Sequence, residues 1–337
     1  MEEAGITKAI IKKMTAVSST LSKTRKKRAV PEGHATQEQI AKYSEQSAHP
    51  IHAASKPGIL TVSVSAKDPS SVVTGGADGA VMVFNKGTGK VTGTLSGHKK
   101  KITQVIAHPT QDLVFSSSAD KTARVWSKSG SDWATACQVT CHKDEVSGIT
   151  LHASGDYFVT ASKDSTWAFH DIASGSCLVQ KEDNEVKKGF SSTVFHPDGL
   201  ILATGTSDAR IRIWDIKAQN SVHTFEGHSN AVESIAFSEN GYYMASGDGA
   251  AVKIWDLRKL KNLQTIDIAA KSVSFDLSGQ FLACGAGSDV GIYLAKTWDV
   301  VATYKGHSDA VTSVAWSPTA NYLATTSMDR NLKFFSA

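Results

Sequence analysis

Short runs of alternating apolar and polar residues recur along most of the chain, and each run has the length of a β-strand. Segment 209–214 alternates charged residues with isoleucine and ends in tryptophan, and segment 231–237 alternates in a similar way. Asp198-Gly199 and Asn240-Gly241 lie between such runs, and both pairs are typical of hairpin turns. The pattern therefore predicts an all-β protein built from short strands and tight turns.

An aspartate that follows a strand end rich in Ser, Thr, Gly and Ala recurs seven times, at intervals of 40 to 44 residues. These residues are Asp78, Asp120, Asp164, Asp208, Asp248, Asp289 and Asp329. Gly-His pairs precede several units, at Gly97-His98, Gly227-His228 and Gly306-His307, with Cys141-His142 as a variant. This period resembles the WD40 repeat, in which each unit forms a four-stranded blade. Seven units imply a seven-bladed WD40 β-propeller over about residues 48–337, in which each blade is sandwiched between two neighbours.

The last unit ends at Phe335-Ser336-Ala337, after three strands. A missing fourth strand would leave the ring with an open edge of unpaired backbone groups. We predict that segment 48–54 pairs with strand 332–336 and closes the ring.

In WD40 blades, a His, a Ser or Thr, an Asp and a Trp form a hydrogen-bonded chain between strands. The matching sets are His98, Ser116, Asp120 and Trp126; His228, Ser246, Asp248 and Trp255; and His307, Thr325 and Asp329, with Phe335 in place of the tryptophan. A His-Asp-Ser grouping could suggest a hydrolase, but this grouping repeats with the blades, which indicates a structural role.

Three units depart from this pattern. The fourth lacks the histidine, the third has His170 where tryptophan is expected, and the sixth has Cys284 in place of Ser or Thr. We expect these blades to rely more on apolar packing. Four cysteines are too few for a disulfide scaffold, which indicates a reducing compartment.

Other chemical motifs are weak. Cys137-x3-Cys141-His142 offers three zinc ligands, but no fourth lies at a suitable spacing, so the sequence predicts no metal site. Phosphate-binding loops and nucleophile elbows are also missing from the sequence. We therefore expect no catalytic residue and no cofactor.

Residues 1–22 predict a short amphipathic helix, with apolar residues at helical spacing: Ile6, Ile10, Met14, Val17 and Leu21. Three interpretations remain open at this point. The helix is the end of a coiled coil, a helix that docks on a partner, or a frayed and solvated segment.

The net charge of +4 is confined to residues 1–54, which hold nine basic and five acidic residues, whereas the remainder is neutral. Residues 23–47 are interpreted as a basic linker arm. It contains a cluster that is either a nuclear-import signal or an ordinary charged linker: Lys23, Arg25, Lys26, Lys27 and Arg28.

Two loops between blades also carry basic runs, on the face that bears the Gly-His turns. They are candidates for binding RNA or an acidic partner, with solvated lysines as the alternative: Lys99, Lys100, Lys101, Lys187 and Lys188. A further candidate set lies on the opposite rim: Arg258, Lys259 and Lys261. No apolar run has the length of a membrane helix, so we expect no membrane partner.

Several segments go beyond the generic repeat, among them 108–115 (HPTQDLVF), 195–201 (FHPDGLI), 255–262 (WDLRKLKN) and 328–334 (MDRNLKF). With the Arg25-Lys26-Lys27-Arg28 arm, they closely resemble the C-terminal half of the pre-mRNA-processing factor family of the spliceosomal Nineteen Complex. The resemblance runs from about residue 20 onward.

This resemblance implies a nuclear interaction scaffold whose partners are spliceosomal and Nineteen Complex proteins, together with ubiquitination substrates. Members of this family carry an N-terminal U-box, which is the ubiquitin ligase module, and a tetramerising coiled coil before the propeller; they also act in DNA-damage responses. The printed sequence holds no U-box, so we expect no ubiquitin transfer by this chain by itself. We expect a homo-oligomer where a coiled coil precedes it.

A second hypothesis concerns Trp255-Asp256-Leu257-Arg258. This tetrapeptide resembles the motif by which propeller substrate receptors dock onto a cullin-RING ligase adaptor. Under this alternative, the chain selects substrates for a cullin-RING ubiquitin ligase.

Overall fold

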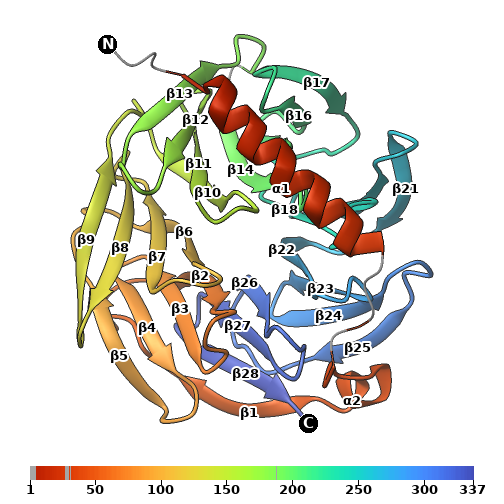
Figure 1. The fold of residues 1–337 in the computed structure, drawn as a ribbon. Helices are drawn as coiled ribbons and strands as arrows, with labels where there is room; N and C mark the ends of the chain where they lie inside the picture. Colours follow the sequence, from red (N-terminus) through yellow and green to blue (C-terminus); the bar gives the residue numbers. More distant parts are fainter. Residues whose placement is uncertain (1–4, 27–29, 31, 187) are drawn as a thin grey trace.

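Seven four-stranded antiparallel sheets surround a central axis in the computed structural model, which describes residues 5–26, 30, 32–186 and 188–337 and, of residues 24–26, the backbone (Figure 1). Each sheet is one blade, numbered here in chain order. This is the seven-bladed propeller that the spacing of the aspartates predicts.

The first three blades follow one another without interruption. Blade 1 comprises β2 (Ile59–Val64), β3 (Ser71–Gly76), β4 (Val81–Asn85) and β5 (Lys90–Leu95). Blade 2 comprises β6 (Ile102–Ala107), β7 (Leu113–Ser118), β8 (Ala123–Ser129) and β9 (Asp132–Val139). Blade 3 comprises β10 (Val146–Leu151), β11 (Tyr157–Ser162), β12 (Thr166–Asp171) and β13 (Cys177–Glu182).

The next three blades repeat this order. Blade 4 comprises β14 (Phe190–Phe195), β15 (Ile201–Thr206), β16 (Ile211–Asp215) and β17 (Asn220–Phe225). Blade 5 comprises β18 (Ser234–Phe237), β19 (Tyr243–Gly247), β20 (Val252–Asp256) and β21 (Lys261–Ile266). Blade 6 comprises β22 (Ala270–Phe275), β23 (Phe281–Ala286), β24 (Asp289–Leu294) and β25 (Val300–Tyr304).

Blade 7 combines the two ends of the propeller. It contains β26 (Val311–Trp316), β27 (Leu323–Ser327), β28 (Leu332–Ser336) and, as its outer strand, β1 (Ser44–His49). The antiparallel register runs from Ser44 opposite Ser336 to His49 opposite Leu332. The partner of β28 is thus the N-terminal segment, as expected, but the strand covers Ser44–His49 rather than residues 48–54, so residues 50–54 take no part in it. Residues 44–49 are mostly exposed and polar, so they carry little of the apolar alternation that marks the other strands.

The buried apolar residues form seven clusters within the described part of the chain, and each cluster is shared by two neighbouring blades. Phe115 of blade 2 and Phe158 of blade 3, for example, have ring centroids 5.3 Å apart. Blade 7 packs on blade 1 through Phe334 and Phe84, whose centroids are 5.9 Å apart. Each blade therefore buries both of its faces because the ring is closed.

Histidines in three hairpin turns also link neighbouring blades. Nε2 of His152 donates to the carbonyl oxygen of Gly199 at 2.8 Å. Gly199 has a φ of +76°, and a Cβ at this position would lie 2.5 Å from the His152 ring. The turn therefore requires glycine both for its backbone conformation and for the close approach of the ring. The other two contacts join His108 to Gly155 and His196 to Gly241.

Helix α1 (Lys8–Lys26) lies diagonally across one face of the ring (Figure 1). Ile6 and Met14 are buried in the same cluster as Tyr157 of blade 3 and Trp214 of blade 4. Lys13 places its Nζ 3.1 Å from Asp156 Oδ2. The first part of the predicted apolar stripe, Ile6, Ile10 and Met14, thus packs on the propeller itself, which differs from all three interpretations. No helix in the described ranges combines the length and the apolar character needed to cross a membrane.

Residues 34–43, which the sequence places in a linker arm, pack into the boundary between blades 6 and 7. The short helix α2 (Gln37–Ala41) begins with a capping box formed by Thr36 and Gln39, and it buries Ile40 completely. The Tyr43 hydroxyl donates to the carbonyl oxygen of Ala320 at 2.6 Å. His34 Nε2 lies 2.9 Å from Asp276 Oδ2, and both side chains are buried. This part of the arm belongs to the core of the propeller.

Candidate functional site

Blade 2 shows the repeated polar network in its complete form. Nε2 of His98 lies 2.9 Å from Ser116 Oγ, and Nδ1 lies 2.9 Å from Asp120 Oδ2. The indole Nε1 of Trp126 donates to Ser116 Oγ at 2.8 Å. The network joins the loop before β6 to β7, to β8 and to the turn between them.

The charges in this network are fixed by burial and hydrogen bonding. Burial lowers the pKa of His98, which favours the neutral imidazole. Burial by itself opposes ionisation of Asp120, but hydrogen bonds from Thr122, the Lys99 amide and His98 lower its pKa to about 2. The network is therefore a neutral histidine held by an ionised carboxylate.

The other two predicted sets are also brought together. In blade 5, Ser246 Oγ lies 2.6 Å from His228 Nε2 and accepts from Trp255 Nε1 at 2.8 Å, while His228 Nδ1 is 3.1 Å from Asp248. In blade 7, His307 contacts Asp329 and Thr325, each at 2.8 Å. Recurrence in separate blades supports a structural role rather than hydrolysis.

Blade 1 contains a related network that the sequence did not reveal. His52 Nε2 lies 2.9 Å from Thr74 Oγ1, and its Nδ1 lies 3.1 Å from Asp78. Ile51 precedes this histidine instead of glycine, so the Gly-His signal is missing. The position of Asp78 in the aspartate series was the available indication.

Blade 4 corrects the expectation that units without the histidine depend on apolar packing. Its Trp214 still donates to Thr204 Oγ1, at 2.9 Å. The buried Arg212 forms ion pairs with Asp183 at 2.9 Å and with Glu185 at 2.7 Å. A charged network therefore occupies this blade, whereas Cys284 of blade 6 lies in an apolar cluster, as expected.

Blade 3 also keeps a polar network, in altered form. Thr160 Oγ1 lies 2.7 Å from His142 Nε2 and 2.9 Å from His170 Nε2, so a second imidazole stands in the place of the indole. Burial lowers the pKa of His170, which is completely buried. The expectation of mainly apolar packing is therefore wrong for this blade as well.

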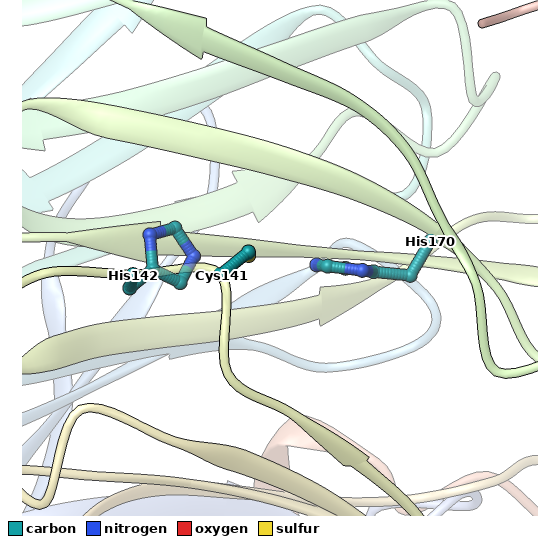
Figure 2. A group of neighbouring side chains, drawn as sticks. All are labelled: Cys141, His142 and His170. Atoms are coloured by element: carbon teal, nitrogen blue, oxygen red, sulfur yellow. The ribbon is translucent and has the colours of Figure 1, made fainter. Parts of the chain in front are cut away.

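Side chains that can bind a metal gather next to His170 of blade 3. Cys141, His142 and His170 offer ligand atoms that all lie within 4.8 Å of one another (Figure 2). Cys177 lies directly across the strand pair from His170. Interaction with the Cys141 thiol, and then with His170, lowers the pKa of Cys177. The sequence missed this grouping because strand pairing, and not spacing along the chain, brings His170 and Cys177 to it.

The two basic loops lie at different blade boundaries. The loop with Lys99, Lys100 and Lys101 lies between blades 1 and 2, and all three side chains are exposed. Lys101 Nζ is 3.7 Å from Glu145 Oε1. Lys188 is exposed between blades 3 and 4, and Lys187 lies outside the described residues.

The predicted import cluster begins within α1. Lys23 is exposed, and Arg25 and Lys26 belong to the helix by their backbone. Lys27 and Arg28 lie outside the described residues.

A cavity of about 860 Å³ opens on the face that carries α1, between blades 4 and 5. Val222, Leu260 and Tyr242 line it with exposed fractions of 54%, 51% and 44%. Arg258 also lines it, with its guanidinium carbon 4.6 Å from the centroid of the Tyr242 ring and Nη2 3.0 Å from Asp256. Lys259 and Lys261 are exposed on the adjoining turn and strand. The cavity therefore combines an apolar lining with a basic rim.

A comparison with models of protein families shows to which family the chain is related. The model of the Prp19 WD40 domain matches residues 51–329. The chain belongs to the Prp19 WD40 family. This result confirms the resemblance drawn from the blade-specific segments. It also assigns the propeller in Figure 1, from just after β1 into the last blade, to a specific WD40 family.

Curated relatives extend the Prp19 match to nearly the whole chain. Pre-mRNA-processing factor 19 of Oryza sativa subsp. japonica is 43% identical over 345 residues, covering 98% of this chain and 65% of the relative. The Homo sapiens protein of the same name is 44% identical over 344 residues, covering 99% of this chain and 68% of the relative. The chain thus spans about two thirds of the length of these Prp19 relatives.

Proposed function

We propose that this chain is an interaction scaffold of pre-mRNA processing in the nucleus, which holds proteins of the splicing machinery. Membership of the Prp19 WD40 family supports this proposal, because several curated relatives are named pre-mRNA-processing factors. The structural support is a rigid closed ring that presents an apolar cavity with a basic rim. A propeller fold does not by itself determine a function, so the proposal depends on this surface.

The cavity between blades 4 and 5 is the proposed docking site. Its lining exposes Val222, Tyr242 and Leu260 side by side with Arg258, and exposed apolar groups next to Tyr and Arg favour protein contacts. Lys259 and Lys261 are exposed on the turn and strand that adjoin the lining residues Arg258 and Leu260, and neither forms an ion pair in the described part of the chain. The occupant is therefore an apolar segment of a splicing protein with an acidic residue beside these lysines.

The finer parts of the proposal concern ubiquitin, DNA and transport. The ring presents substrates to a U-box ubiquitin ligase and participates in DNA-damage responses, as the family resemblance implies. The cluster at Lys23, Arg25, Lys26, Lys27 and Arg28 directs nuclear import. The loop lysines at 99–101 contribute an RNA contact whose affinity falls with rising salt.

A pull-down from nuclear extract, with mass spectrometry to identify the captured proteins, tests the scaffold. The Leu260→Asp variant places a charge in the cavity, and we expect at least a tenfold loss of splicing proteins relative to the unmodified chain. Val300→Asp is the matched control, because Val300 is an exposed apolar residue (61%) on blade 6, away from the cavity.

Two outcomes would contradict the proposal. Equal recovery of splicing proteins by both variants would remove the cavity as the docking site. Capture of a cullin adaptor in place of splicing proteins, with loss of that capture in Arg258→Ala, would favour the cullin-RING receptor alternative.

A further inference from the structure

Blade 3 departs from its sister blades at three positions that meet in space, and each change introduces a residue type that binds metals. The aromatic residue of the third strand is Trp126, Trp214 and Trp255 in blades 2, 4 and 5 but His170 in blade 3. Its cross-strand partner is Thr135, Ser221 and Asn262 in those blades but Cys177 in blade 3. The residue before the network histidine is Gly97 and Gly227 in blades 2 and 5 but Cys141 in blade 3.

The sister blades explain why the Cys141 side chain lies beside His170. A Cβ added to Gly97 would lie 3.2 Å from Cη2 of Trp126, and one added to Gly227 would lie 3.7 Å from Cη2 of Trp255. The glycine position thus stands against the far end of the indole. The Cys141 side chain points toward the His170 ring (Figure 2). An imidazole is shorter than an indole, so the smaller ring leaves room for this thiol.

The hydrogen bonds of Thr160 determine which nitrogen of His170 carries the proton. In blade 2 the indole can act only as a donor to the hydroxyl group. His170 Nε2 occupies that donor place at Thr160, and the hydroxyl then donates to His142 Nε2. His170 Nδ1 therefore keeps a free lone pair. This atom is buried and makes no hydrogen bond within the described residues.

The space left by the smaller ring explains why a cysteine side chain fits at position 141, but it leaves two observations unexplained. Cys177 is exposed, so it fills no hole in the core. A buried nitrogen without a hydrogen bond is also unfavourable, by about 1–3 kcal/mol where it stays unpaired. A ligand bound by both thiols and by this nitrogen accounts for the position of Cys177 and gives the nitrogen a partner.

We propose that Cys141, His170 and Cys177 bind a Zn²⁺ ion in blade 3, with His142 as the fourth ligand. Two thiolates and two imidazoles form one of the common tetrahedral sets for structural zinc. The ligand atoms of Cys141, His142 and His170 already lie within 4.8 Å of one another, and Cys177 is the direct cross-strand partner of His170.

The surroundings of the site orient both histidines. His142 Nδ1 lies 2.9 Å from Thr166 Oγ1 and 3.5 Å from Asp164 Oδ2, so its proton faces oxygen atoms and Nε2 keeps the lone pair. His142 exchanges its hydrogen bond with Thr160 for the metal. A carboxylate behind a ligating histidine is a usual second partner of protein-bound zinc. The exposed Cys177 gives the ion a route from solvent.

The test is a titration of the full chain with Co²⁺ after reduction of its thiols and removal of metal with a chelator. We expect one equivalent of Co²⁺, with the thiolate charge-transfer bands and the intense visible absorption of a tetrahedral site. Competition with a coloured chelator then gives the affinity for Zn²⁺. Bound Zn²⁺ should raise the melting temperature of the unmodified chain, since a ligand of the native state stabilises it.

The variants distinguish ligation from packing. Cys177→Ser should lower the Zn²⁺ affinity at least tenfold and still fold, because blade 4 carries Ser221 at the equivalent position. Cys137→Ser is the matched control, since the Cys137 thiol hydrogen-bonds to the Gly175 carbonyl group at 3.4 Å and should leave the affinity unchanged.

Three results would overturn the proposal. The first is a Co²⁺ spectrum without thiolate charge-transfer bands. The second is an equal Zn²⁺ affinity for Cys177→Ser and the unmodified chain. The third is a Cys141–Cys177 disulfide, detected by peptide mass spectrometry, in chain kept under reductant throughout purification.

Discussion

Blades 2 and 3 are neighbours with the same strand order, yet their polar networks end differently. In both, a hydroxyl group on the second strand contacts the ring of a histidine that precedes the first strand. In blade 2 the hydroxyl accepts from the indole of Trp126, whereas in blade 3 it meets the imidazole of His170. The comparison indicates that the blade needs a ring donor at this place and does not need an indole.

The two blades also differ in how the rings pack. His98 and Trp126 meet edge to face, with centroids 6.1 Å apart. His170 stacks on Phe158 at 4.7 Å instead. The imidazole of blade 3 is smaller than the indole of blade 2. Cys141 and Cys177 therefore lie next to the imidazole, whereas in blade 2 the indole itself occupies the equivalent space.

The largest expected effect comes from a change to the ring closure that both blades share. Deletion of residues 1–54 removes β1, the outer strand of blade 7, and exposes the edge of β28. We expect the melting temperature to fall by at least about 10 °C, since several kcal/mol are lost and each shifts it by about 2–4 °C in a large domain. Circular dichroism measures the change, with deletion of residues 1–33 as the milder control. An unchanged melting temperature would exclude closure by β1.

Replacement of the indole of blade 2 by the ring of blade 3 comes next. Trp126→His keeps a donor for Ser116 but leaves a cavity in a fully packed cluster. We expect the free energy of unfolding to fall by about 3–4 kcal/mol, measured by urea denaturation. The reverse change, His170→Trp, should lower the free energy of unfolding by about 1–3 kcal/mol, because the larger ring overpacks against Cys141. Equal and small effects of both changes would show that the two environments are interchangeable.

The hydroxyl group itself is the next target. Ser116→Ala and Thr160→Val each leave two ring nitrogens without their partner. Each change should reduce the free energy of unfolding by about 1–3 kcal/mol, the usual effect of unpaired buried groups. The control is Ser96→Ala on the surface, with an expected change within about 0.5 kcal/mol. A loss confined to blade 2 would mean that Thr160 does not bridge His142 and His170.

A double mutant tests whether the glycine-to-cysteine change compensates for the smaller ring. Gly97→Cys alone should destabilise blade 2, because its Cβ would crowd Arg124 and Trp126. Combined with Trp126→His, the same cysteine should recover about 0.5–3 kcal/mol relative to additivity. Chemical denaturation of the four chains gives this coupling, and strict additivity would refute the compensation of volume.

The smallest expected effect is on the loss of folding stability at low pH. The pKa of Asp120 is lowered to about 2, so its stabilising contribution is complete above the ordinary carboxyl pKa of 3.8 and is lost as the pH falls toward 2. The lowered pKa of His98 acts in the same direction, because protonation of the buried ring opposes folding below pH 6.5. Asp120→Asn should reduce stability by about 1–2 kcal/mol at pH 7 and flatten the loss between pH 4 and 2. An unchanged slope in acid-denaturation curves would exclude this carboxylate as its source.

The repeat made the ring predictable, because the aspartates recur at a nearly constant interval and Gly-His pairs precede three of the blades. The two complete polar sets, and the third set without its tryptophan, followed from the same periodicity. The pairing of β1 was expected because β28 lacked a partner, but its start at Ser44 was not, since an exposed outer strand needs no apolar alternation.

Contacts that depend on register or on folding back of the arm could not be predicted. His170 and Cys177 meet because they are opposite each other in an antiparallel pair, and spacing along the chain does not reveal that register. His34 lies in a polar stretch, yet it is buried against Asp276 by the packing of Ile40 and Tyr43 on blades 6 and 7. In the sequence, Arg212 is simply a charged residue in a strand of alternating pattern. Only the tertiary structure places Asp183 beside it.

The pairing of Ser44–His49 with Leu332–Ser336 has a consequence for the order of folding during synthesis. The ribosome releases β1 long before β28 exists, so β1 must wait for nearly the whole propeller to be translated. Such a contact between distant segments forms slowly, because a long loop has to close first. Until the final strand emerges, the growing ring presents two unpaired strand edges, which are sites for pairing with other chains. Chaperone protection of the nascent chain is therefore needed most until β28 has been synthesised.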